Sequence, residues 1–233
     1  MASYHIRKFQ ERDGQGVREL FSKAMGDNIS PTFYHCLKLP RNLLFLTGVL
    51  LITLLVTGSR LLTLLAGLAF LAALRFLAQH VWSQYITFTL NTTLSDISKH
   101  YMSGRGSCFW VAESQGRVVG TVGALPVRGP ALSREHLELF RLCVDSAHRG
   151  QGIAKALVRT VFQFGQDHGY KAVVLSTSSV QYAALGLYQR LGFRRIHEFP
   201  HATFWTLIQL TVIKFIYHLP STQGSKGPRL EDP

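Results

Sequence analysis

The chain has 233 residues, 47% of them hydrophobic, and 25 Lys and Arg against 13 Asp and Glu give a formal net charge of +12. Three scattered cysteines, Cys36, Cys108 and Cys143, exclude a disulfide framework, and no Cys or His spacing is typical of a metal site, so we expect no metal. The positive charge suits acidic ligands and anionic lipid, but no nucleic-acid-binding module is recognisable and the basic residues form no dense stripe, so we expect no direct nucleic-acid binding.

Residues 1–41 are mostly polar and charged, which argues against a cleavable signal peptide. A short strand is predicted at residues 4–9, and a helix with an acidic start is predicted at residues 13–21.

Residues 43–74 are apolar apart from Arg60 and a few Thr, Ser and Gly. The run exceeds the ~20 residues that cross a bilayer. A central Arg costs about 2.5–3.5 kcal/mol on insertion, but each Leu gains roughly 0.3–0.6 kcal/mol, so membrane residence is favoured. We therefore predict a membrane anchor over residues 42–75.

The anchor has two possible forms: one long tilted helix with a buried Arg60, or a helical hairpin that turns at residues 58–60. Lys38 and Arg41 before the block and Arg75 after it favour a hairpin with both ends in the cytosol. A pair of buried core helices in a soluble protein is the remaining alternative. Asn91 begins a glycosylation triplet, which is usable only if this part is luminal.

Residues 76–220 are predicted to form the rest of one domain, and the polar tail at residues 221–233 is predicted to be disordered. An amphipathic stretch at 82–102 is followed by a hairpin that turns at Gln115 and Gly116. The predicted strands lie at 109–113, 118–126, 137–144, 172–176, 194–197 and 203–213, and the helices at 153–168 and around Tyr188.

The turn Arg149-Gly150-Gln151-Gly152-Ile153-Ala154-Lys155 joins a predicted strand to a predicted helix. Such a turn directs backbone N–H groups at one point, where a pyrophosphate can bind. It matches neither G-x-G-x-x-G nor the P-loop, but Arg149, Gly152 and Ala154 form R-x-x-G-x-A. The small residues let phosphates approach the main chain, and Arg149 and Lys155 add positive charge. An ordinary strand-to-helix turn is the alternative.

A second motif lies at residues 181–193, where Ala184, Tyr188, Gly192 and Phe193 fit N-x-x-A-x-x-x-Y-x-x-x-G-F. Gln181 stands where the pattern has Asn, and Gly192 is a typical helix stop. By itself Tyr188 is more typical of a packing residue, but its spacing to both motifs favours a role in chemistry.

The two motifs resemble the acetyl-coenzyme A signature of the GNAT superfamily. The order of elements, the apolar block after the first helix, and the segments 106–113 and 152–159 make nearly the whole chain similar to the camello-like N-acetyltransferase family. The resemblance implies an α+β fold, with a mixed, mostly antiparallel sheet flanked by helices and interrupted by a membrane-embedded helical segment. It implies an acetyltransferase of the endoplasmic reticulum and early secretory pathway, from ER to Golgi, that moves acetyl from acetyl-CoA to an amine. Known family acceptors include cysteine S-conjugates and protein lysines, and camello is linked to cell adhesion in gastrulation.

The resemblance also implies roles for single residues. The main chain of Leu142, Cys143 and Val144 would pair with the pantetheine arm, the turn at 149–155 would hold the pyrophosphate, and Tyr188 would protonate the departing thiolate as a general acid. The cofactor contact of the family Asn is in doubt at Gln181.

Glu138 occupies the place of the carboxylate that deprotonates the amine in some GNAT enzymes. Strand alternation puts it on the face of Phe140, Leu142 and Val144, where burial would raise its pKa, and a solvent-facing Glu is the alternative. Direct attack in a ternary complex is favoured over a ping-pong route through Cys143, because no His activates that thiol in sequence. A weakly active or inactive scaffold in adhesion or development is the rival function, which Gln181 supports and which Gly152, Ala154 and Tyr188 oppose.

Overall fold

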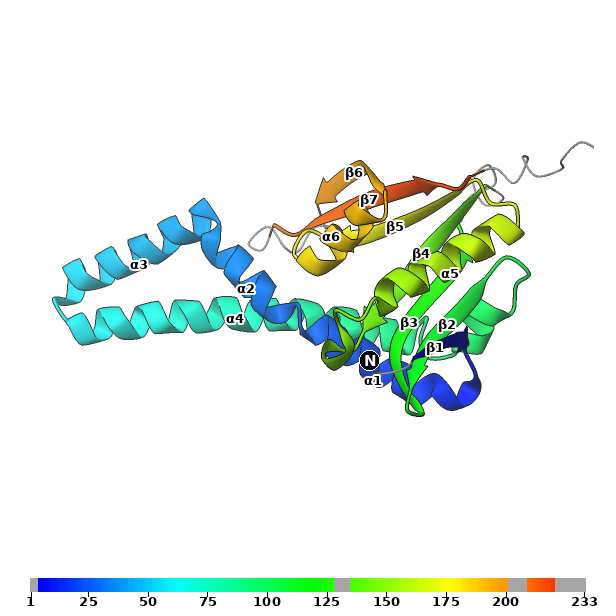
Figure 1. Cartoon of the computed structure of the whole chain (residues 1–233). Coiled ribbons are helices and arrows are strands. Elements are labelled where there is room, and N and C mark those ends of the chain that lie inside the picture. Colours follow the sequence, from blue (N-terminus) through cyan, green and yellow to red (C-terminus); the bar gives the residue numbers. More distant parts are fainter. Residues whose placement is uncertain (1–3, 128–134, 201–208, 221–233) are drawn as a thin grey trace, which may run out of the picture.

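The computed structural model describes residues 4–127, 135–200 and 209–220 (Figure 1). Seven strands form one sheet in the order β1-β2-β3-β4-β5-β7-β6, in which only β4 and β5 run parallel. The strands are β1 His5–Lys8, β2 Cys108–Ser114, β3 Arg117–Pro126, β4 His136–Val144, β5 Ala172–Ser178, β6 Arg194–Pro200 and β7 Thr211–His218. The mostly antiparallel sheet flanked by helices is the predicted α+β fold.

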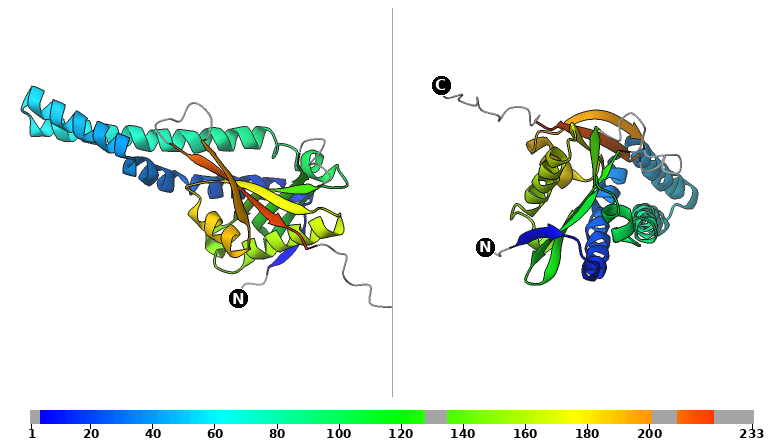
Figure 2. Two further views of the ribbon diagram at one scale, coloured as in Figure 1. Left: turned by 90° about the horizontal axis from the view of Figure 1, so that it is seen from above. Right: turned by 90° about the vertical axis from the view of Figure 1, so that its right-hand side faces the viewer.

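Helices cover both faces of the sheet (Figures 1 and 2). α5 and α6 lie on one face, where the buried core includes Leu139, Leu157 and Phe215. α1 and α4 lie on the other, where it includes Phe21 and Trp82. The helices are α1 Gly14–Gly26, α2 Ile29–Lys38, α3 Pro40–Thr57, α4 Arg60–Asn91, α5 Ile153–Asp167 and α6 Tyr182–Arg190, with short 3-10 turns at Glu11–Asp13 and Ser146–His148 and a π-helical turn at Ser98–Met102.

The β2–β3 hairpin turns at the two predicted residues. Gln115 and Gly116 both have positive φ, 51° and 74°, which fits the twist of a tight two-residue hairpin. α6 ends as predicted before Gly192, whose φ is 88°.

α3 and α4 pack against each other as an antiparallel hairpin that projects away from the sheet (Figure 1). Gly58, with φ of 64°, ends α3, and the Ser59 hydroxyl accepts the Leu62 N–H to begin α4. Of the arrangements left open by the sequence, the structure therefore contains the hairpin. α4 runs on past Arg75 to Asn91 because no Gly, Pro or cap interrupts residues 76–91.

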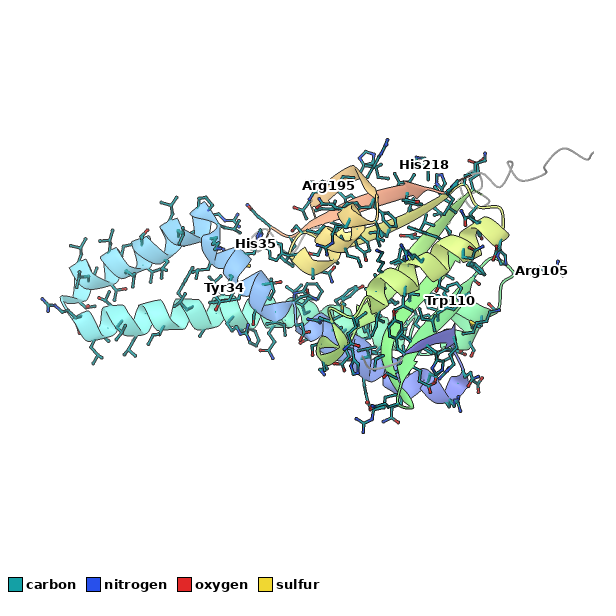
Figure 3. The ribbon with its side chains drawn as sticks, viewed as in Figure 1. Tyr34, His35, Arg105, Trp110, Arg195 and His218 are labelled. Atoms are coloured by element: carbon teal, nitrogen blue, oxygen red, sulfur yellow. The ribbon has the colours of Figure 1, made fainter. Side chains whose placement is uncertain are left out.

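Both hairpin helices are long and apolar enough to cross a membrane. Only 6% of the most apolar stretch of α3 and 11% of that of α4 is buried, whereas the core helix of a soluble protein is mostly buried. The end of α4 nearer the sheet does contribute to the core, through Trp82. Their side chains project outward along both helices (Figure 3).

Several predicted boundaries differ from the structure, two of them widely. The stretch 82–102 is divided between the end of α4 and the separate turn Ser98–Met102. The last strand runs over Thr211–His218, because its pairing with β5 extends from Ser178↔Val212 to Ala172↔His218. The rest of the expected strand, residues 203–208, and the tail 221–233 lie outside the described residues.

Candidate active site

The strand before the glycine-rich turn contains a β-bulge. β4 pairs Phe140 with Gly123 and Cys143 with Thr121, so that one residue of β3 faces two of β4. Arg141, at the bulge, has a left-handed φ of 55°. An extra residue reverses the side-chain alternation of a strand.

This reversal corrects the predicted placement of Glu138. Leu142 and Val144 pack on the α5 side, whereas Phe140 and Cys143 pack on the α1 and α4 side. Glu138, two residues before Phe140, is on that second side, so it does not share a face with Leu142 and Val144. Strict alternation fails here because Arg141 is inserted between the two halves of the strand.

The parallel strands β4 and β5 separate at the same place. Their pairing ends at Leu139↔Leu175, although β4 continues to Val144 and β5 to Ser178. The β4 main chain from Phe140 onward has no β5 partner among the described strands. A gap therefore opens at the carboxyl ends of the two strands, where ligands bind in open α/β sheets.

A cavity of about 550 Å³ lies at this gap. It is bordered by α6, the N-terminal end of α5 and the α1–α2 connection, on the side from which the hairpin projects (Figure 1). It brings together most of the predicted site residues: Leu142, Cys143, Val144, Arg149, Gly150, Gly152, Ile153, Ala154, Lys155, Gln181 and Tyr188. Gln151 and Glu138 do not line it.

The glycine-rich turn forms an open cap on α5. Gly150 and Gly152 have φ of 79° and 82°, and Gly152 is the N-cap of α5 with no side-chain hydrogen bond to it. A Cβ at either glycine would meet nothing within 4 Å, so the backbone conformation, and not crowding, requires glycine. The first-turn N–H groups and the helix dipole can therefore receive an anion.

Charged side chains surround this cap. Lys155 lines the cavity, and Arg149 donates to Asp27 at 2.6 Å, across 122 residues of sequence. Both members of this ion pair are about half exposed. Asp27 thus holds the guanidinium that the motif assigns to phosphate, a contact for which the sequence contains no local signal.

Tyr188 lies where α6 meets the cavity. It is 5% exposed, and its ring centroid lies 5.6 Å from that of Phe193 and 5.9 Å from that of Phe215. Burial, and then the nearby Cys143, raises the pKa of its phenol. The side chain is thus both a packing residue and a protonated group at the cavity wall.

Two further titratable groups lie on β4. Burial raises the pKa of the Cys143 thiol to about 12, so the group is a thiol and not a nucleophilic thiolate at neutral pH. Burial also raises the pKa of Glu138, against the opposing charge of Lys214.

Gln181 closes the turn between β5 and α6. Its Oε1 accepts from the Thr177 hydroxyl at 2.7 Å and from the Ser178 N–H at 3.2 Å. The amide oxygen therefore stabilises the turn by accepting hydrogen bonds, and the Gln181 side chain also lines the cavity. Within the described ranges, no group of three or more His, Cys, Asp and Glu side chains could hold a metal ion.

Comparisons with known proteins identify the family. The model of the acetyltransferase (GNAT) family matches residues 74–193. Human N-acetyltransferase 8B is 53% identical over 97% of this chain and 100% of its own length, and human N-acetyltransferase 8 is 51% identical over 96% of this chain and 98% of its own. N-acetyltransferase 8 of Rattus norvegicus is 52% identical over 95% of this chain and all of its own.

Solved structures share the fold at low sequence identity. A GNAT-family acetyltransferase of Staphylococcus aureus has a TM-score of 0.58 at 15% identity, with 94% of this chain and 100% of that chain covered. The protein yncA of Salmonella typhimurium, solved with its cofactor acetyl-CoA, has a TM-score of 0.53 at 14% identity, with 98% and 99% covered. The chain belongs to the GNAT acetyltransferase family and, within it, to the N-acetyltransferase 8 family, and it is an acetyl-CoA-dependent N-acetyltransferase.

Proposed function

We propose that this protein is a membrane-anchored enzyme that transfers acetyl from acetyl-CoA to an amine by direct attack in a ternary complex. One observation carries the proposal: the cavity joins the edge of β4 that β5 leaves unpaired, the open cap of α5 and the Tyr188 side chain. The acceptor is a cysteine S-conjugate or a protein lysine, the two classes that the family resemblance implies.

The cavity residues fit acetyl-CoA in three parts. The main chain of Leu142–Val144 is free to pair with the amides of the pantetheine arm, since β5 does not pair with it. The turn 149–155 supplies N–H groups and positive charge to the pyrophosphate. In this proposal the thioester lies beside Cys143 and Tyr188, which both line the cavity.

The transfer breaks one bond and forms one. The neutral amine nitrogen attacks the thioester carbonyl carbon, the C–S bond breaks, and Tyr188 donates its proton to the departing sulfur. The proton lost by the amine passes to a base and returns to the phenolate through solvent. The ordinary pKa of a tyrosine is about 10 and burial raises that of Tyr188 further, so the phenol carries the proton that it donates at neutral pH.

The base is Glu138 or a water molecule. Glu138 is half-buried on the α1 and α4 face of β4, outside the cavity lining. It can serve an amine that reaches the strand from that face. Its raised pKa makes it a stronger base than an exposed carboxylate.

The α3–α4 hairpin is the proposed membrane anchor. The 18 residues of α3 span about 27 Å, close to the ~30 Å of a hydrocarbon core. Arg60 at the turn would then reach the far headgroups, which costs less than burial at the bilayer centre. Lys38, Arg41 and Arg75 at the other end favour a cytosolic catalytic domain on the membranes of the endoplasmic reticulum and Golgi.

The test is acetyl transfer by microsomes that contain the full chain, with a cysteine S-conjugate and a lysine peptide offered in parallel. The variant Arg149→Glu/Gly152→Glu places negative charge at the cap, and Arg159→Glu changes the charge on an exposed position of the same helix outside the cavity. We expect transfer to one acceptor, abolished in the cap variant and retained in the control. Coenzyme A binding without transfer to either acceptor would favour the scaffold function, in line with Gln181.

A further inference from the structure

Arg141 holds a backbone conformation that needs support. Its φ of 55° lies in the left-handed region, which is unfavourable for an L-residue. The residue forms the bulge that turns Leu142 and Val144 toward the cavity side. The strand keeps this conformation only if the surrounding contacts stabilise it.

The Arg141 side chain leaves the sheet on the α1 and α4 side. Its Nη1 donates to the Tyr85 hydroxyl at 2.7 Å and its Nη2 to the Thr93 hydroxyl at 2.9 Å. The guanidinium carbon lies 5.4 Å from the centroid of the Phe21 ring and 5.9 Å from that of the Tyr85 ring. Its main-chain oxygen accepts from the Thr121 hydroxyl at 2.9 Å.

Both hydroxyl partners belong to the hairpin helix or its end. Tyr85 is in α4, and Thr93 is two residues beyond the last residue of that helix. α4 is continuous from Arg60 at the hairpin turn to Asn91 beside the sheet (Figure 2). The helix that carries the apolar hairpin therefore also binds the bulge.

The same contacts argue against an anion site at Arg141. Arg141 does not line the cavity, and its two terminal nitrogens already donate to hydroxyls. The guanidinium is arranged to join two elements, with aromatic rings and hydroxyls around it.

We infer that Arg141 is a positioning residue, which ties the β4 bulge to α4 and so keeps the Leu142–Val144 main chain in the conformation that receives the pantetheine arm. The inference rests on the proposed function for the identity of that ligand. Tyr85 and Thr93 act in the same way, although neither lines the cavity.

The test measures coenzyme A binding and steady-state kinetics on the full-length protein in detergent. Arg141→Met keeps the length of the side chain and removes the tether, and Tyr85→Phe/Thr93→Val removes the two acceptors of its hydrogen bonds. We expect each to raise the Kd of coenzyme A about tenfold, which is about 1.4 kcal/mol. The KM for the acceptor stays unchanged, and the triple variant is no worse than Arg141→Met, because all three side chains serve one contact.

Arg141→Lys places one ammonium group where the guanidinium donates to the hydroxyls of Tyr85 and Thr93. Its Kd for coenzyme A should lie between those of the wild type and Arg141→Met. Arg159→Met on the exposed face of α5 is the matched control, and thermal unfolding identifies variants that fail to fold. An unchanged coenzyme A Kd in Arg141→Met, or a rise confined to the acceptor KM, overturns the inference. Binding of coenzyme A is read without turnover, so an inactive wild type would refute the proposed function and leave this test intact.

Discussion

Replacing Tyr188 by Phe tests the proposed general acid with a minimal change. The substitution removes one hydroxyl and keeps the ring, whose neighbours Phe193 and Phe215 contribute packing and not hydrogen bonds. We therefore expect thermal stability to change little. The cap proposed to hold the pyrophosphate is on α5 and not on α6, so the KM for acetyl-CoA should stay within about twofold.

The expected loss is in kcat. A positioned general acid contributes about 10²–10⁴-fold, which corresponds to about 3–5 kcal/mol of activation free energy. Without the phenol, the thiolate leaves unprotonated or takes a proton from water. An acyl donor with a more acidic thiol needs less help, so the loss in Tyr188→Phe should shrink with such a donor.

The pH profile gives a second measurement. The phenol acts in its protonated form, and burial raises its pKa above the ordinary value of about 10. Wild-type kcat should therefore not fall between pH 8 and about 10 through ionisation of Tyr188. A variant with unchanged kcat, or with lost coenzyme A affinity and a lower unfolding temperature, would refute the reasoning and make Tyr188 a packing residue.

Three further substitutions separate the roles of nearby groups. Asp27→Asn should lower the KM for acetyl-CoA by about 1.5- to 5-fold, because an exposed ion pair worth about 0.2–1 kcal/mol no longer competes for Arg149. Glu198→Gln, which breaks another surface ion pair, is the control. An unchanged KM in Asp27→Asn would contradict the prediction. Cys143→Ala should retain most of the wild-type turnover, since a thiol whose pKa is about 12 forms no acetyl intermediate, and total loss with intact folding would restore the ping-pong route. If Glu138 is the base, Glu138→Gln should lower kcat and remove the acidic limb of the pH profile of kcat. Burial raises the pKa of Glu138 in the folded protein, so its ionised carboxylate opposes folding at neutral pH. The melting temperature of Glu138→Gln should therefore rise or stay constant. Unchanged kinetics in that variant would leave water as the base.

Local patterns predicted the elements that bound the cavity. The small residues Gly152 and Ala154 predicted the start of α5, and Gly192 predicted the end of α6. These two helix ends could be predicted because each needs a backbone conformation that few residues adopt. The Gln115-Gly116 turn was predicted for the same reason. Where one or two residues determine the backbone φ of a turn or a helix end, the sequence is sufficient to predict that feature.

Features that depend on distant contacts were not predictable. The bulge at Arg141 has no glycine to mark it, and its support comes from Tyr85 and Thr93, 56 and 48 residues earlier in the chain. Asp27 reaches Arg149 only because α1 packs beside β4. The half of α4 nearer the sheet continues the apolar helix with no Gly, Pro or cap to separate the two halves. Composition alone therefore could not show where α4 begins to pack against α1 and α2.

The position of the hairpin in the chain relates the membrane to the site. On one side, α2 links the hairpin to the α1–α2 connection, whose Asp27 borders the cavity. On the other side, α4 itself continues to Tyr85, which binds the bulge. A 32-residue helix spans about 48 Å, so its apolar end and its sheet end cannot tilt independently. If the hairpin inserts as proposed, the bilayer holds two parts of the cavity in place. These are the α1–α2 connection, which faces the proposed pyrophosphate site, and β4, which faces the proposed pantetheine site. Detergents that let the hairpin tilt differently should therefore change the KM for acetyl-CoA more than the KM for the acceptor.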